Sequence, residues 1–129
     1  MSHETATILL VDDEELLREG VQEMLELGGY AVITANNGQE AMASLANPAI
    51  DLVITDLVMP KMDGVDFVEQ LRKVRPDVPV LVVSGSTRNI MARYGIDTIQ
   101  VPGADASLSK PFKGLDLMSQ IKTLLASRH

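Results

Sequence analysis

Short apolar runs alternate along the chain with longer amphipathic segments. Four of these runs are rich in β-branched residues and contain no polar alternation, which is typical of strands covered on both faces in a parallel sheet. They occupy residues 8–11, 31–33, 52–54 and 80–83. The alternation of such runs with helical segments predicts an α/β fold.

Apolar residues recur at helical spacing in three of the intervening segments, and each stripe can pack on the sheet. The stripes are Leu17, Val21, Met24 and Leu25, then Val65, Val68 and Leu71, then Leu115, Met118, Ile121 and Leu125. A weaker, Ala-rich helix is predicted over residues 39–45, and a poorer one over residues 88–94. The fifth strand is assigned to residues 106–109, although two of these four residues are serine.

The five resulting β-α units predict one open, doubly wound parallel sheet with helices on both faces, since crossover connections are right-handed. We expect a single domain over residues 1–129, with its core in residues 6–126 or so. Ligands of such sheets bind beyond the carboxyl ends of the strands. The residues at those ends are therefore the candidates for chemistry.

Composition narrows the classes of function. The 129 residues contain no cysteine, which excludes disulfides, a thiolate nucleophile and Cys-ligated zinc or iron–sulfur sites. No apolar stretch is long enough for a membrane span or a secretion signal, so a cytoplasmic protein is expected. The net charge of −7 repels nucleic acid, and the basic cluster Arg72, Lys73 and Arg75 is too small to reverse this.

Five polar residues follow the apolar runs and converge on the same edge of the predicted sheet. They are Asp12 and Asp13 after the first run, Asp56 after the third, Ser84 after the fourth and Lys110 after the fifth strand. Three carboxylates in one place repel each other unless a cation or a proton compensates them. Mg²⁺ (or Mn²⁺) suits such an oxygen-rich, open site, and the absence of His and Cys among these five residues argues against zinc or copper.

With Asp56 as nucleophile, the same residues fit phosphoryl transfer to a carboxylate. The metal, Lys110 and the Ser84 hydroxyl would then each neutralise one oxygen of the transferred group. Taken singly, each residue has an ordinary explanation. Asp12 and Asp13 can cap the helix that starts near Glu14, and Lys110 can be a solvated surface residue. The occurrence of all five residues at one edge of the predicted sheet is what favours a functional site.

The chain resembles the receiver domains of two-component response regulators, the chemotaxis-regulator-like family, over nearly its whole length. The matching motifs are ILLVDDE at residues 8–14, DLVITDLVMPKMDG at 51–64, SG at 84–85, GAD at 103–105 and KPF at 110–112. The resemblance implies a flavodoxin-like sheet of order 2-1-3-4-5 and a cis bond between Lys110 and Pro111.

It also implies that Asp56 accepts a phosphoryl group from a histidine kinase or a histidine phosphotransfer protein. Asp12, Asp13 and Asp56 would hold the metal, together with the backbone carbonyl of Val58. The expected role is that of a phosphorylatable switch acting on an output partner, without direct nucleic-acid or membrane binding. Such a protein is a signalling module rather than a turnover enzyme.

Three features of the sequence depart from the family. Where the family usually has Tyr or Phe on the fifth strand, this chain has Ser107, so the usual aromatic step that follows movement of the Ser84 hydroxyl is expected to be absent. The longer spacing from Ser84 to Lys110, with Pro102 inside it, predicts a short or displaced fourth helix. Val58 cannot hold an attacking water, which predicts slow hydrolysis of the aspartyl phosphate.

Two other functions remain open at the level of sequence. A pseudo-receiver that only binds proteins is disfavoured by the complete set of site residues, although Ser107 and the altered fourth helix keep it under consideration. A phosphohydrolase of the haloacid dehalogenase class would also form an aspartyl phosphate. That class needs a second acid two residues after the nucleophile, where this chain has Val58.

Overall fold

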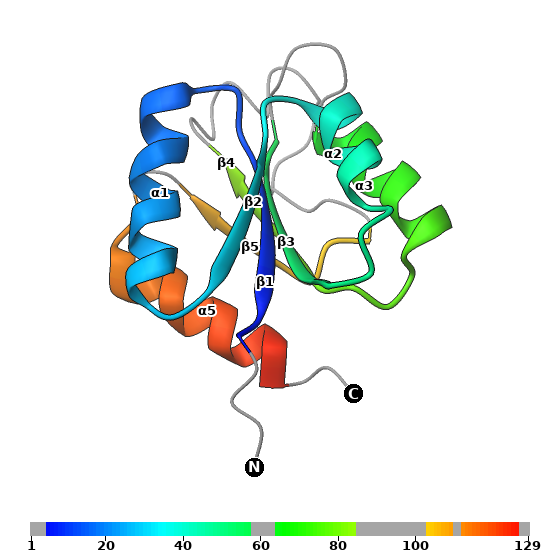
Figure 1. The fold of residues 1–129 in the computed structure, drawn as a ribbon. Helices are drawn as coiled ribbons and strands as arrows, with labels where there is room; N and C mark the ends of the chain where they lie inside the picture. The colour runs from blue at the N-terminus through cyan, green and yellow to red at the C-terminus, as the bar shows by residue number, and fades with distance from the viewer. Residues whose placement is uncertain (1–4, 58–63, 85–102, 110–111, 127–129) are drawn as a thin grey trace.

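Five parallel strands form the centre of the molecule, in the spatial order β2-β1-β3-β4-β5 (Figure 1). The computed structural model describes residues 5–57, 64–84, 103–109 and 112–126. The strands are β1 (Thr7–Val11), β2 (Ala31–Ala35), β3 (Ile50–Asp56), β4 (Val80–Ser84) and β5 (Ala106–Ser109). The predicted doubly wound sheet and its strand order are thereby confirmed.

Helices cover both faces of this sheet. On one face lie α1 (Glu15–Leu27) and α5 (Gly114–Ala126), and on the other lie α2 (Gly38–Ser44) and α3 (Gly64–Val74) (Figure 1). The side-chain oxygen of Asn37 accepts a hydrogen bond from the Glu40 backbone N–H (3.0 Å). This cap starts α2 one residue earlier than the predicted 39–45. None of the helices in the described ranges is long and apolar enough to cross a lipid bilayer.

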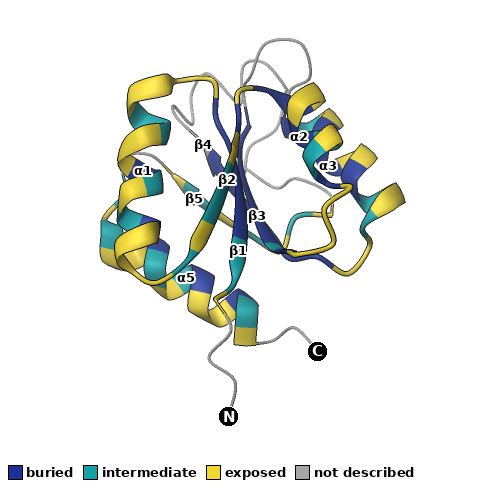
Figure 2. Ribbon diagram, viewed as in Figure 1, coloured by how far each residue is buried: buried dark blue, intermediate teal, exposed yellow. Residues whose placement is uncertain are grey.

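The core consists of two apolar clusters, one on each face of the sheet. Successive residues of β1 alternate between them: Ile8 and Leu10 pack with α1 and α5, whereas Leu9 and Val11 pack with α2 and α3. All four side chains are buried, and Figure 2 shows burial concentrated in the central strands. Because both faces of β1 are covered, its sequence is apolar at every one of these positions.

The edge strand β5 is much less buried than the centre of the sheet. Ala106 and Leu108 are half-buried against the α1 and α5 side, whereas Ser107 and Ser109 are exposed. The strand nevertheless begins and ends at the predicted residues. The predicted fourth helix over residues 88–94, the predicted effect of Pro102 and the predicted cis bond at 110–111 lie outside the described residues.

Arg75, which directly follows α3, anchors the connection between α2 and β3. Its guanidinium Nη1 donates to the carbonyl oxygens of Leu45 and Asn47 (both 3.3 Å), and Nη2 donates to that of Ile50 (2.7 Å). Leu45 is the C-cap of α2, where carbonyl groups lack partners within the helix, whereas the Asn47 carbonyl also accepts from the Ile50 N–H (3.4 Å). The Arg75 guanidinium thus stabilises the fold through hydrogen bonds within the domain.

Gly64 brings the start of α3 into direct contact with the end of β3. Its backbone N–H donates to the carbonyl oxygen of Leu57 (2.6 Å). A Cβ atom placed on Gly64 would lie 2.6 Å from the Asp56 carbonyl oxygen and 2.6 Å from the Leu57 Cα. Both of these atoms belong to the backbone and cannot rotate away. Glycine is therefore the residue that permits this approach.

We expect Gly64→Ala to lower the free energy of unfolding by about 1–3 kcal/mol, because the backbone must shift to admit the methyl group. Gly20→Ala is the matched control, since an added Cβ in the middle of α1 meets no atom within 4 Å. That control should raise the free energy of unfolding by about 1 kcal/mol through helix propensity. Urea denaturation measures both changes. A Gly64→Ala midpoint at or above that of the wild type would contradict the close contact.

Candidate functional site

Three aspartate side chains meet at the carboxyl ends of β1 and β3. Val11 lies opposite Thr55 in the β1–β3 ladder, so the next residues, Asp12 and Asp56, end neighbouring strands side by side. Asp13 follows immediately. Ligand oxygens of the three carboxylates all lie within 4.8 Å of one another. The structure thus brings together three of the residues that the sequence singled out.

The three carboxylates differ in their exposure to solvent. Asp12 and Asp56 retain only 3% and 5% of their accessible surface, whereas Asp13 is exposed. Like charges at such separations repel strongly when water is largely excluded. A divalent cation relieves this repulsion, and Mg²⁺ prefers a few carboxylate oxygens plus water or phosphate oxygens. The donor set therefore fits Mg²⁺, and the exposure of Asp13 leaves the cluster accessible to solvent.

Asp12 also organises the turn into α1. Its Oδ1 accepts a hydrogen bond from the Glu14 backbone N–H (2.9 Å), and its own N–H donates to the Ala35 carbonyl (3.1 Å). The predicted helix cap by Asp12 is not formed, because Glu14 is the N-cap residue of α1 and Asp12 instead closes the turn just before it. A carboxylate has several lone pairs, so one such bond leaves capacity for a metal ion.

Arg18 is a neighbour of this site that the residue pattern does not predict. Its guanidinium Nη1 donates to the backbone carbonyl of Asp12 (2.8 Å). The only signal for this contact is the position of Arg18 in the first turn of α1, where acids are the favoured residues. A positive charge therefore lies next to the aspartate cluster while its hydrogen bond goes to the backbone.

The backbone around Asp56 is fixed from two sides. The buried Thr55 hydroxyl donates to the Asp56 carbonyl oxygen (3.0 Å), and the Leu57 N–H donates to the Val83 carbonyl oxygen on β4 (3.0 Å). On the other side, Gly64 packs against the Asp56 carbonyl oxygen. The strand end that carries Asp56 is thus held by both β4 and α3.

The remaining predicted residues lie around this edge or outside the described ranges. Ser84 is the last residue of β4, one position beyond Val83, which is opposite Asp56. Its backbone therefore reaches the predicted edge of the sheet. Lys110 follows the last residue of β5 in the chain, and both Lys110 and Val58 are outside the described residues.

Ser107 takes the position at which the resemblance leads one to expect an aromatic residue. It lies opposite Val82 in the β4–β5 ladder, and its side chain is exposed. The small hydroxyl at this place covers little of the sheet. The expectation that the usual aromatic step is absent stays a prediction.

Comparison with known proteins gives the same family as the motifs. The chain matches the response regulator receiver domain over residues 8–122. It is 40% identical over 118 residues to the transcriptional regulatory protein CpxR homolog of Haemophilus influenzae, covering 92% of this chain and 49% of that protein. Response regulator MprA of Mycobacterium leprae is 36% identical over 118 residues, covering 92% and 50%. The chain spans about half the length of these relatives.

Solved structures resemble the fold closely. A CheY-like response regulator receiver domain protein from Methanospirillum hungatei superposes with a TM-score of 0.81 at 30% identity, covering 95% of both chains. Response regulator TrrA from Thermotoga maritima, in complex with Mg²⁺ and BeF, gives a TM-score of 0.78 at 30% identity, covering 93% of this chain and 99% of that one. Sheet order, motifs and relatives agree, and the chain belongs to the response regulator receiver domains of two-component systems.

Proposed function

We propose that this receiver domain accepts a phosphoryl group on Asp56 and that the reaction requires Mg²⁺, or Mn²⁺, held by Asp12, Asp13 and Asp56. The observation that carries the proposal is the set of three carboxylates within 4.8 Å at the carboxyl ends of β1 and β3. The backbone carbonyl of Val58 is the proposed fourth protein ligand. Asp12 contributes to the turn into α1, but that contact does not offset the repulsion between its buried carboxylate and that of Asp56, which a bound cation would relieve.

In the proposed reaction, a carboxylate oxygen of Asp56 attacks the phosphorus of a phosphohistidine. The new P–O bond forms as the P–N bond breaks, and the departing imidazole keeps the electron pair and takes a proton from solvent. An ionised carboxylate has no proton to lose, so the nucleophile needs no general base. When bound, the metal would supply positive charge to one phosphoryl oxygen. Lys110 and the Ser84 hydroxyl are proposed to bind the other two.

The proposed phosphoryl donor is a sensor histidine kinase or a histidine phosphotransfer protein. The support is the membership of the chain in the receiver family, and the regulators among its relatives. Phosphorylation would then change the affinity of the domain for an output partner. In this proposal the domain catalyses only its own phosphorylation and dephosphorylation.

Incubation with acetyl phosphate and MgCl₂ should add one phosphoryl group to the wild-type protein. Asp56→Ala should gain none, because the nucleophilic oxygen is gone, and omission of Mg²⁺ should strongly slow the wild-type reaction. Intact-mass spectrometry measures the product. Asp116→Asn, an exposed acid on α5, is the control and should react like the wild type. An unmodified wild-type protein would favour the protein-binding module instead.

Asp13→Asn should shift stability in opposite directions with and without metal. Without Mg²⁺, loss of one of three repelling charges should raise the melting temperature. At free Mg²⁺ a hundredfold above Kd, the wild type should gain about 2.7 kcal/mol by linkage, and most of this gain should disappear in the variant. Glu23→Gln, an exposed acid farther along α1, should respond to Mg²⁺ like the wild type. Equal metal responses in Asp13→Asn and wild type would refute the ligand role.

Hydrolysis of the aspartyl phosphate should be slow in the wild type, because the apolar side chain of Val58 offers no hydrogen bond to an attacking water. Val58→Asn should raise the hydrolysis rate about tenfold, less than a full general base contributes. Val58→Ala controls for the loss of bulk alone and should change the rate much less. Decay of the phosphorylated species after removal of acetyl phosphate gives the rates. The idea fails if Val58→Asn and Val58→Ala decay at the same rate.

A further inference from the structure

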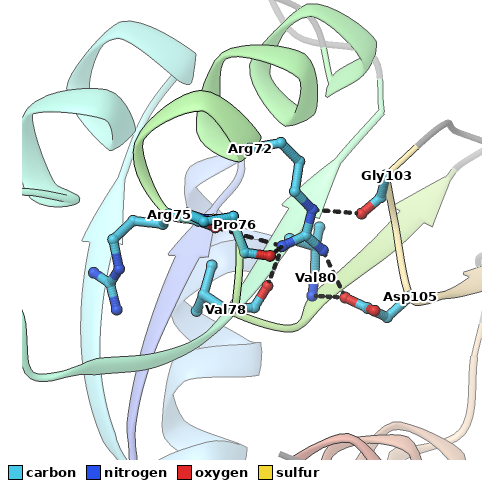
Figure 3. Close-up of polar contacts among 7 residues, drawn as sticks. All are labelled: Arg72, Arg75, Pro76, Val78, Val80, Gly103 and Asp105. Carbon is cyan, nitrogen blue, oxygen red and sulfur yellow. Dashed lines mark hydrogen bonds and ion pairs between the residues drawn. The ribbon is translucent and has the colours of Figure 1, made fainter.

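A hydrogen-bonded ion pair lies at the amino ends of β4 and β5, at the opposite edge of the sheet from the aspartates (Figure 3). Asp105, directly before β5, pairs through Oδ2 with Nη2 of Arg72 on α3 (2.8 Å). The same Oδ2 accepts from the Val80 N–H (2.8 Å), and the Asp105 N–H donates to the Val80 carbonyl (2.9 Å). Asp105 is thereby tied both to α3 and to the first residue of β4.

Arg72 uses its remaining donors on the backbone of two connecting segments. Nε donates to the Gly103 carbonyl (2.8 Å), and Nη1 donates to the carbonyls of Val78 (2.6 Å) and Pro76 (3.0 Å). The planar guanidinium presents these donors in a fixed arrangement, which a lysine cannot reproduce. We refer to Arg72 and Asp105 with these backbone partners as the Arg72–Asp105 clamp.

Strand β5 has little else to fix its register on β4. It is four residues long, with Ser107 and Ser109 exposed and Ala106 and Leu108 only half-buried. Register is weakly specified in strands that bury few apolar side chains. The clamp, by contrast, joins Asp105 to Val80 through two hydrogen bonds and to Arg72 through the ion pair, and this register places Ser109 opposite Ser84.

We propose that Arg72 and Asp105 are positioning residues for phosphoryl transfer: by fixing the register of β5 on β4, they set the point at which the chain leaves the sheet toward Lys110. The inference rests on the proposed function, in which Lys110 binds a phosphoryl oxygen. A slip by one residue would displace that point by about 3.3 Å and reverse the faces of β5. Misplacement of a catalytic group by even about 1 Å reduces rates severely.

Asp105→Ala should slow phosphorylation by acetyl phosphate about tenfold, as expected for a displaced charged group. Asp105→Asn keeps an oxygen for the Val80 N–H but loses the ion pair. Its phosphorylation rate should lie between those of the wild type and Asp105→Ala. Asp77→Ala removes an exposed carboxylate from the turn before β4 and should keep the wild-type rate. The Mg²⁺-dependent rise in melting temperature should be retained in all three variants, since the clamp lies at the other edge of the sheet.

The decisive comparison combines the clamp with Lys110. In a Lys110→Ala background, Asp105→Ala should slow the reaction by at most about twofold, because its effect passes through the missing lysine. Hydrogen exchange should also become faster at residues 106–109 in Asp105→Ala, with β1 unchanged. Equal slowing in both backgrounds, a wild-type rate in Asp105→Ala, or unchanged exchange in β5 would overturn this inference alone. A wild type that gains no phosphoryl group would overturn the proposed function and this inference with it.

Discussion

The pairing of β1 with β3 holds like charges together, and the rest of the site depends on it. Asp12 and Asp56 would separate in a flexible chain, but they extend two neighbouring strands whose side chains are buried on both faces. Burial of apolar surface is the dominant favourable term in folding, so the core supplies the free energy that keeps the carboxylates close. The arrangement of carboxylates to which we propose that a cation binds is thus set by the sheet itself.

The two edges of the sheet divide the charges between them. Arg72 and Arg75 make their contacts around the amino ends of the strands, whereas the aspartate cluster lies at the carboxyl ends. The five residues of β1 span about 13 Å between these edges, at roughly 3.3 Å per residue. Arg72 and Arg75 therefore stabilise the fold at a distance from the aspartates, whereas Arg18 places its charge next to them.

The sequence was most informative where chemistry follows directly from strand direction. Asp12 and Asp56 each end an apolar run, and parallel strands bring such ends together, so their meeting was predictable. The contacts of Arg18 and Arg72 were not, because most of their acceptors are backbone carbonyls, which leave no trace in the residue pattern. The close approach at Gly64 was hidden for a similar reason. A glycine before a helix fits many loops, and only the positions of Asp56 and Leu57 show that no side chain fits there.

Arg75 has a consequence for how this domain can vary in evolution. The oxygens it binds at Leu45, Asn47 and Ile50 are all main-chain carbonyls, which every type of amino acid provides. Arg75 therefore places no demand on the side chains at these three positions, although Leu45 is buried in the core and the Asn47 side chain accepts from the Ala49 N–H (2.9 Å). The arginine has no such freedom, because its fork of donors has no substitute among the other side chains. Part of the shape of this loop is thus encoded in a residue that lies outside it.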